Sequence, residues 1–196
     1  MSDPTNGGTP AARLAPVDPA SDTLFVYGTL RFRRILTALL GHVPSAAPAT
    51  VTGWRTAALR GRPYPGLVPA PGRTAHGLLL TGLDARAWRV LDAFEDDEYA
   101  LRRLTARTAA GPAAGPGTPV PAWSYTWTSP AQVRPDDWEA DTFAGQLLDG
   151  YATRLEQAAH HAPRRGTGSG TPGRGSSGDR DAHRGAAPRQ GRPGSD

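Results

Sequence analysis

The chain has 196 residues, of which 38% are hydrophobic, and this suits one globular domain with residues to spare. It contains no cysteine, which excludes a disulfide scaffold, a thiol nucleophile and any cysteine-ligated metal or iron–sulfur site. No apolar run approaches the roughly 18 residues of a membrane span, and the N-terminal sequence lacks the pattern of a signal peptide. We therefore expect a cytoplasmic protein without membrane contact.

The net charge of +4 comes from one end of the chain. Residues 160–196 contain seven Arg and three Asp, which account for all of it. This segment has no aromatic side chain on which a base could stack, and its charge supports only weak, salt-sensitive binding to nucleic acid. We therefore expect no specific nucleic-acid partner.

Composition predicts one folded unit between two disordered segments. Residues 1–21 contain four Pro and no aromatic residue, and no large apolar residue follows Leu155. Such segments bury too little apolar surface to offset the entropy lost on ordering. We expect disorder in residues 1–21 and in the Arg/Gly/Pro-rich tail 159–196, with the domain at 22–158.

The first half of the domain predicts a buried strand, a helix and two further strands. The apolar run 23–27 ends at Gly28. Residues 30–40 carry an apolar face and end at Gly41, a typical helix C-cap. Residues 50–59, with a bulge at Gly53, and residues 76–80 read as strands, separated by a turn at 60–65.

The second half predicts two helices around two strands. Asp84 can cap a helix that carries Trp88 and Leu91 on one face. Strands follow at 99–108 and 121–128, with a loop at 111–119 between them. Residues 136–157 place Phe143, Leu147, Tyr151 and Leu155 at helical spacing. This order predicts an α+β fold with a curved, mixed but mainly antiparallel, barrel-like sheet and flanking helices.

Two segments could carry chemistry. At Tyr27, Gly28, Thr29 and Leu30 a strand turns into a helix, which exposes backbone N–H groups suited to an anion; the turn could equally be only a connection. Five carboxylates fall within residues 92–98, and Glu95 lies on the apolar face of the predicted helix. Partial burial would raise the pKa of Glu95 and suit a general base; the alternative is a solvated acidic helix end. The spacing does not indicate a metal site.

A third segment, 60–69, combines Pro and Gly with Arg62, which could meet an anion, although most such segments are only connections.

The segments FVYGTL, GRPYPGLVP, LDAFEDDEY and AWSYTW, in this order, resemble the gamma-glutamylcyclotransferase-like superfamily, with the closest similarity to the avirulence-induced plant proteins and their bacterial relatives. The resemblance covers about residues 23–156. It implies a barrel-like sheet with helices, a substrate loop at Tyr27, Gly28, Thr29 and Leu30, and a catalytic acid/base at Glu95. The implied reaction converts a gamma-glutamyl amide into 5-oxoproline and a free amine, with no metal or cofactor. A non-catalytic small-molecule binding protein of the same fold is the alternative.

Deleting residues 160–196 should leave the melting temperature nearly unchanged, because the segment has no large apolar side chain to pack. Thermal unfolding of the full and shortened chains tests this. A fall of more than a few degrees would show that the tail docks on the domain.

Overall fold

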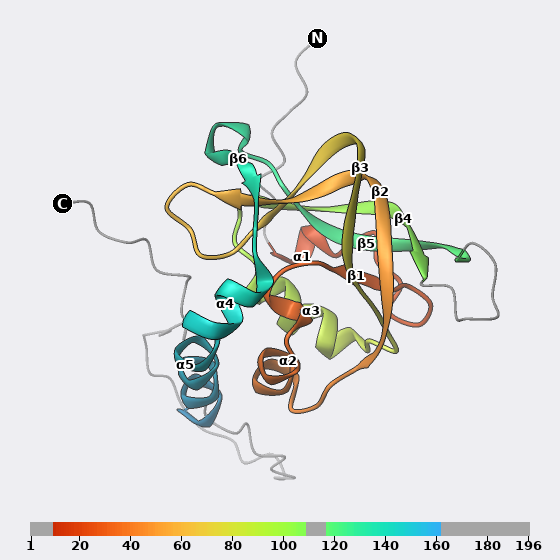
Figure 1. Cartoon of the computed structure of the whole chain (residues 1–196). Helices are drawn as coiled ribbons and strands as arrows, with labels where there is room; N and C mark the ends of the chain where they lie inside the picture. The colour runs from red at the N-terminus through yellow and green to blue at the C-terminus, as the bar shows by residue number, and fades with distance from the viewer. Residues whose placement is uncertain (1–9, 109–116, 162–196) are drawn as a thin grey trace, which may run out of the picture.

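The computed structural model describes residues 10–108 and 117–161 (Figure 1). Its helices are α1 (Pro10–Arg13), α2 (Arg33–Leu40), α3 (Ala85–Phe94), α4 (Ala140–Gln146) and α5 (Leu148–His161), with short 3-10 helices η1 (Thr29–Arg31) and η2 (Pro130–Gln132). Its strands are β1 (Leu24–Val26), β2 (Ser45–Leu59), β3 (Gly66–Thr81), β4 (Tyr99–Thr108), β5 (Pro119–Trp127) and β6 (Val133–Asp137). No helix in these ranges is long and apolar enough to cross a membrane.

Five strands close into a barrel. β1 pairs in parallel with β5 and antiparallel with β3, and β5 pairs antiparallel with β4. β2 pairs antiparallel with both β4 and β3, which completes the ring, and β6 adds to β2. The helices flank the barrel (Figure 1). The predicted α+β fold with a curved, mixed and mainly antiparallel sheet is confirmed.

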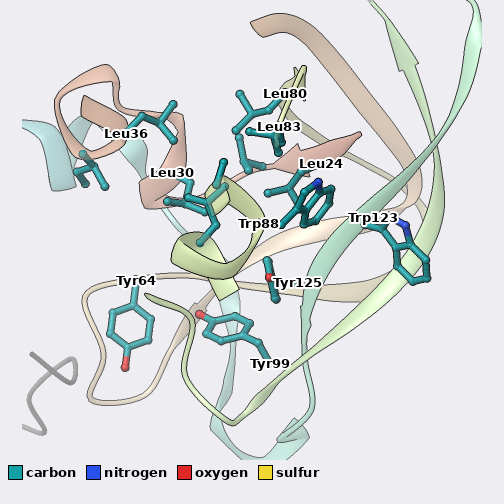
Figure 2. Packing of buried hydrophobic residues seen from close by; sticks show 14 of the residues in the cluster. Leu24, Leu30, Leu36, Tyr64, Leu80, Leu83, Trp88, Tyr99, Trp123 and Tyr125 are labelled. Carbon is teal, nitrogen blue, oxygen red and sulfur yellow. The ribbon is translucent and has the colours of Figure 1, made fainter. Parts of the chain in front are cut away.

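Alternation along β1 separates two hydrophobic clusters. Phe25 and Tyr27 belong to a cluster with contributions from all five barrel strands, which places it inside the barrel. Leu24 and Val26 belong to the larger cluster, which also holds the helices. In Figure 2 Leu24 lies with Trp88 of α3, and both side chains are almost fully buried. The barrel therefore provides both an inner core and an outer surface that holds α3.

Several local predictions are confirmed. Gly41 caps α2 with a left-handed φ of 83°, and Gly53, with φ 84°, lies at the register shift in the β2–β3 ladder. The Asp84 carboxylate accepts a hydrogen bond from the Ala87 N–H at the start of α3. Trp123, Tyr125 and Trp127 of β5 all join the larger cluster, as their alternation predicted.

β2 and β3 form a longer hairpin than the sequence predicted. The predicted strand 76–80 is the end of β3, whose pairing with β2 runs from Ala57↔Gly66 to Ser45↔Thr81 around the turn at 60–65. Pro69 and Pro71 hid the earlier part, because proline cannot donate to the ladder and lowers strand propensity.

The prediction of one helix over 136–157 is wrong. Asp137 ends β6 and pairs with Ala57, and the Arg55 guanidinium holds this strand through the carbonyls of residues 134–136. α4 and α5 meet at Leu147, which has φ −125° and is 43% exposed, so it is not part of the apolar face. Phe143, Tyr151 and Leu155 do pack on the core.

The N-terminal segment also differs from its prediction. Residues 10–21 of the segment 1–21, which we expected to be disordered, carry α1, and Leu14 and Val17 pack on the larger cluster. The composition of the segment did not indicate this order, because only two aliphatic side chains and one Arg make the contacts. At the other end, α5 includes the first residues of the predicted tail 159–196. Residues 1–9, 162–196 and most of the loop 111–119 lie outside the described residues.

Candidate active site

One pocket collects both segments that the sequence singled out. The turn after β1 and the residue that follows α3 face each other across it, although they lie more than 60 positions apart in the chain. The pocket is narrow, with a volume of about 20 Å³, which is room for about one water molecule. Its lining comprises Phe25, Val26, Tyr27, Gly28, Thr29, Leu30, Tyr64, Pro65, Glu95, Tyr99 and Tyr125.

The turn after β1 lines this pocket with the residues Tyr27, Gly28, Thr29 and Leu30. β1 ends at Val26, and η1 begins at Thr29 with Gly28 as its N-cap. The bonds of this helix run from the Arg31 N–H to the Gly28 carbonyl and from the Phe32 N–H to the Thr29 carbonyl. The N–H groups at the start of a helix have no partner within it. They are therefore placed to meet an anion or a developing oxyanion.

Gly28 is needed for close approach. Its φ of −109° is not left-handed, but its ψ of −134° lies outside the extended and helical regions. A Cβ built on Gly28 would lie 2.8 Å from Cγ and 3.2 Å from Cδ of Pro65. A side chain here would push the turn away from Pro65, which lines the same pocket. This contact joins the first candidate segment to the third, 60–69.

Glu95 lies at the junction between α3 and the following loop. It is the C-cap of α3, with extended φ and ψ of −81° and 135°, and its N–H donates to the Leu91 carbonyl. We expected Glu95 on the apolar face of the helix. The helix instead ends one residue earlier, at Phe94, so Glu95 is its C-cap. At the cap position Glu95 still lines the pocket.

Burial gives Glu95 unusual acidity. Loss of hydration raises the pKa of Glu95 to about 8, since water is the best solvent for the charged form. The positive charge of Arg13 acts in the opposite direction, and the negative charges of Asp96 and Asp92 add to the increase. With a pKa of about 8, this carboxyl group is mainly protonated at pH 7, and a smaller fraction is ionised.

Arginine side chains hold three of the other carboxylates in this run. Asp92 pairs with Arg13 at 2.6 Å and is buried. Asp96 and Glu98 both pair with Arg62, which lies over the ring of Trp127 at 5.0 Å. The alternative of a solvated acidic helix end therefore does not describe Asp92 and Asp96, whose side chains are 2% and 17% exposed.

The remaining members of the run are Glu95 and Asp97. Within the described residues neither makes an ion pair, and Asp97 is exposed. Glu95 is the member of the run that lines the pocket.

Three tyrosine hydroxyls tie the wall of the pocket together. The Tyr27 hydroxyl donates to the Tyr125 carbonyl at 2.8 Å, and the Tyr99 hydroxyl donates to the Pro65 carbonyl at 2.6 Å. The Tyr125 hydroxyl donates to Asp92 at 2.9 Å. Burial raises the pKa of all three phenols well above the usual value, so they remain neutral donors. Tyr99 and Tyr125 lie beneath α3 in Figure 2.

The sequence did not point to Tyr64, Pro65, Tyr99 or Tyr125 as pocket residues. Tyr99 directly follows the acidic run, and Tyr125 shares a strand face with two tryptophans, so neither stood out from an ordinary core position. Arg62, for which we considered an external anion, instead contacts carboxylates of its own chain. Within residues 10–108 and 117–161 no group of His, Asp and Glu is arranged to hold a metal ion.

Two solved structures from Arabidopsis thaliana share the fold. A solution structure of an Arabidopsis thaliana protein superimposes with a TM-score of 0.54 at 21% identity, covering 83% of this chain and 98% of that one. A second, also from Arabidopsis thaliana, has a TM-score of 0.52 at 21% identity and covers 71% and 91%. At this identity the similarity establishes the fold alone.

Sequence comparison identifies the family. Residues 24–140 match the family described as gamma-glutamyl cyclotransferase, AIG2-like. The AIG2-like protein D of Arabidopsis thaliana is 36% identical over 77 residues, which cover 39% of this chain and 51% of that protein. The AIG2-like protein C is 36% identical over 80 residues, covering 41% and 46%. The chain thus spans about half the length of the curated relatives it matches. It belongs to the AIG2-like gamma-glutamyl cyclotransferase family.

Proposed function

We propose that this protein is a gamma-glutamyl cyclotransferase, which converts a gamma-glutamyl amide into 5-oxoproline and a free amine. The observation that carries the proposal is a carboxyl group, Glu95, that faces the same pocket as the turn Tyr27–Leu30 and has no arginine partner among the described residues. Membership of the family supports the same reaction.

The reaction needs little beyond positioning and proton transfer. The α-amino nitrogen of the substrate attacks the γ-carbonyl carbon and closes a five-membered ring, and the bond from that carbon to the leaving nitrogen breaks. No water is consumed, because the substrate carries its own nucleophile. Holding the two reacting groups together supplies a high effective molarity.

Glu95 has the properties that the proton transfers require. The substrate's α-amino group is an ammonium at neutral pH and must lose a proton before it attacks. A carboxylate whose pKa is raised to about 8 is a much stronger base than an ordinary one. Once protonated, it can return the proton to the leaving nitrogen. The attacking nitrogen loses a second proton as the ring forms, and the released amine takes up this proton and leaves as an ammonium.

The turn Tyr27–Leu30 supplies the electrostatic part. The N–H groups at the start of η1, which have no partner within that helix, can hold the substrate carboxylate or the oxyanion that forms at the γ-carbon. The pocket holds about one water molecule, so a gamma-glutamyl group enters only when the lining moves apart.

The alternative is a binding protein of the same fold without catalysis. A site that only binds the α-ammonium of a gamma-glutamyl group would be served best by a fully ionised carboxylate, whereas burial keeps Glu95 mainly protonated at pH 7. The raised pKa of Glu95 therefore favours catalysis over simple binding.

Glu95→Gln should fold normally and lose most of its turnover, by roughly 10²–10⁴-fold, because the amide keeps the shape of the side chain but cannot accept the proton. Release of 5-oxoproline from a panel of gamma-glutamyl amides measures this. Asp97→Asn is the matched control, since Asp97 is exposed on the same loop. Activity of Glu95→Gln within threefold of the wild type would rule out the assignment.

The same substitution should change the pH dependence of stability. Folding raises the pKa of Glu95 from 4.5 to about 8, so this group stabilises the fold below pH 4.5 and that contribution is lost as the pH rises towards 8. Between these values the melting temperature of the wild type should therefore fall relative to that of Glu95→Gln. Two curves that run parallel from pH 4.5 to 9 would contradict burial of this carboxyl group.

Gly28→Ala should reduce turnover or substrate affinity more than it reduces stability, because the new Cβ displaces the turn from Pro65. Gly145→Ala in α4 is the control, since a Cβ there meets nothing within 4 Å. Thermal unfolding measured beside the kinetics separates the two effects. If Gly28→Ala were destabilised but kept wild-type kinetic constants, the turn would have no role in binding.

A further inference from the structure

Arg13, in the segment before the barrel, sends its side chain into the domain. The side chain is 11% exposed, and its guanidinium lies over the ring of Tyr125 at 5.4 Å. Its Nε donates to the Asp92 carboxylate at 2.6 Å. A buried arginine that also stacks on an aromatic ring is held in one orientation, unlike the exposed ion pairs elsewhere on this surface.

The other N–H groups of Arg13 donate hydrogen bonds to the backbone around Glu95. They reach the carbonyl oxygens of Asp92 at 2.6 Å, Glu95 at 3.3 Å, Asp96 at 3.2 Å and Tyr99 at 3.1 Å. The last carbonyls of a helix lack partners within it and carry partial negative charge. Arg13 thus caps the C-terminus of α3 and fixes the loop through which the chain leaves Glu95.

Arg13 also shapes the electrostatics of the pocket. α1 packs on α3 (Figure 1) and brings a positive charge close to Asp92, while Arg62 supplies a second positive charge at Asp96 and Glu98. The groups whose charges act on or respond to Glu95 are Arg13, Asp92, Asp96, Tyr27, Tyr99, Tyr125 and Tyr151. Arg13 is the one in this set that lowers the pKa of Glu95. Its loss should therefore move that pKa further upward.

We infer that Arg13 is a positioning residue of the active site, which holds the Glu95 loop in its catalytic geometry from outside the barrel. The inference rests on the proposed function, because it concerns the reaction assigned to Glu95. It also makes the N-terminal segment part of the catalytic unit. Arg13 does not line the pocket, so it acts through the backbone of residues 92–99 and through Asp92.

Two substitutions separate the positive charge of Arg13 from its set of hydrogen bonds. Arg13→Gln removes the charge and most of the hydrogen bonds. We expect kcat to fall by up to about 100-fold, as displacement of a catalytic group does, and the pKa of Glu95 to rise. Arg13→Lys keeps the charge but loses the planar set of donors. It should lower kcat while leaving the pKa of Glu95 near the wild-type value. Arg34→Gln, which removes a partly exposed arginine paired with Asp149 and Glu156, is the control and should change neither.

The pKa is read by carbon-13 NMR titration of the side-chain carboxyl groups, with the Glu95 signal assigned by its absence in Glu95→Gln. This readout needs no turnover, so it separates two failures. If the wild type releases no 5-oxoproline, the proposed function fails, while the titration of Arg13→Gln still reports whether Arg13 acts on Glu95.

The inference is overturned if Arg13→Gln lowers only the melting temperature and keeps the wild-type kcat and Glu95 pKa at temperatures where it is folded. Should Arg13→Gln not fold, Arg13→Lys decides. A lower kcat with an unchanged Glu95 pKa supports the positioning role, and a wild-type kcat overturns it.

Discussion

The site depends on one electrostatic constraint. The carboxyl group of Glu95 is partly removed from water, and within the described residues it makes no ion pair with an arginine. Asp92, Asp96 and Glu98 surround Glu95 in sequence, and each has an arginine partner. Glu95 faces the pocket, where burial favours its protonated form. The arginine partners of these neighbours offset the repulsion among the carboxylates, while Glu95 makes no ion pair within the described residues.

The fold provides this arrangement at the edge of a closed barrel. β1 pairs with β3 on one side and with β5 on the other. The turn that follows β1 is therefore held by strands on both sides. α3 packs across the outer face through Trp88 and Leu91, and its last residue brings Glu95 opposite that turn. The hydrogen bonds of Tyr27 and Tyr99 then connect β5 and the hairpin turn to the same wall. Rigid elements thus hold both halves of the pocket.

Much of this architecture could be predicted from local sequence signals. Examples are the helix caps Gly41 and Asp84 and the alternation of aromatic residues along β5. Each of these signals acts over a few positions, so it could be recognised from the sequence alone. Tyr27–Leu30 and Glu95 were found in the same way, one from a strand-to-helix turn and the other from a carboxylate on an apolar face. That they share one pocket is a property of the barrel.

The features that the sequence did not predict depend on long-range contacts. Residues 133–137 became a strand because Arg55 and the edge of β2 bind their backbone, which no local pattern records. Arg13 lies in a segment with little apolar content, and its partners are carbonyl groups about 80 positions away. Backbone acceptors carry no sequence signature, so an arginine that binds them resembles a surface residue.

The identity of the nucleophile is the central claim, and product analysis tests it most directly. The wild-type protein is incubated with a gamma-glutamyl amide that carries nitrogen-15 in its α-amino group, and the products are identified by mass spectrometry and NMR. If the α-amino group attacks, the label appears in the ring of 5-oxoproline, with one equivalent of free amine. Labelled glutamate in place of 5-oxoproline would show that water attacked the γ-carbonyl, and would contradict the account.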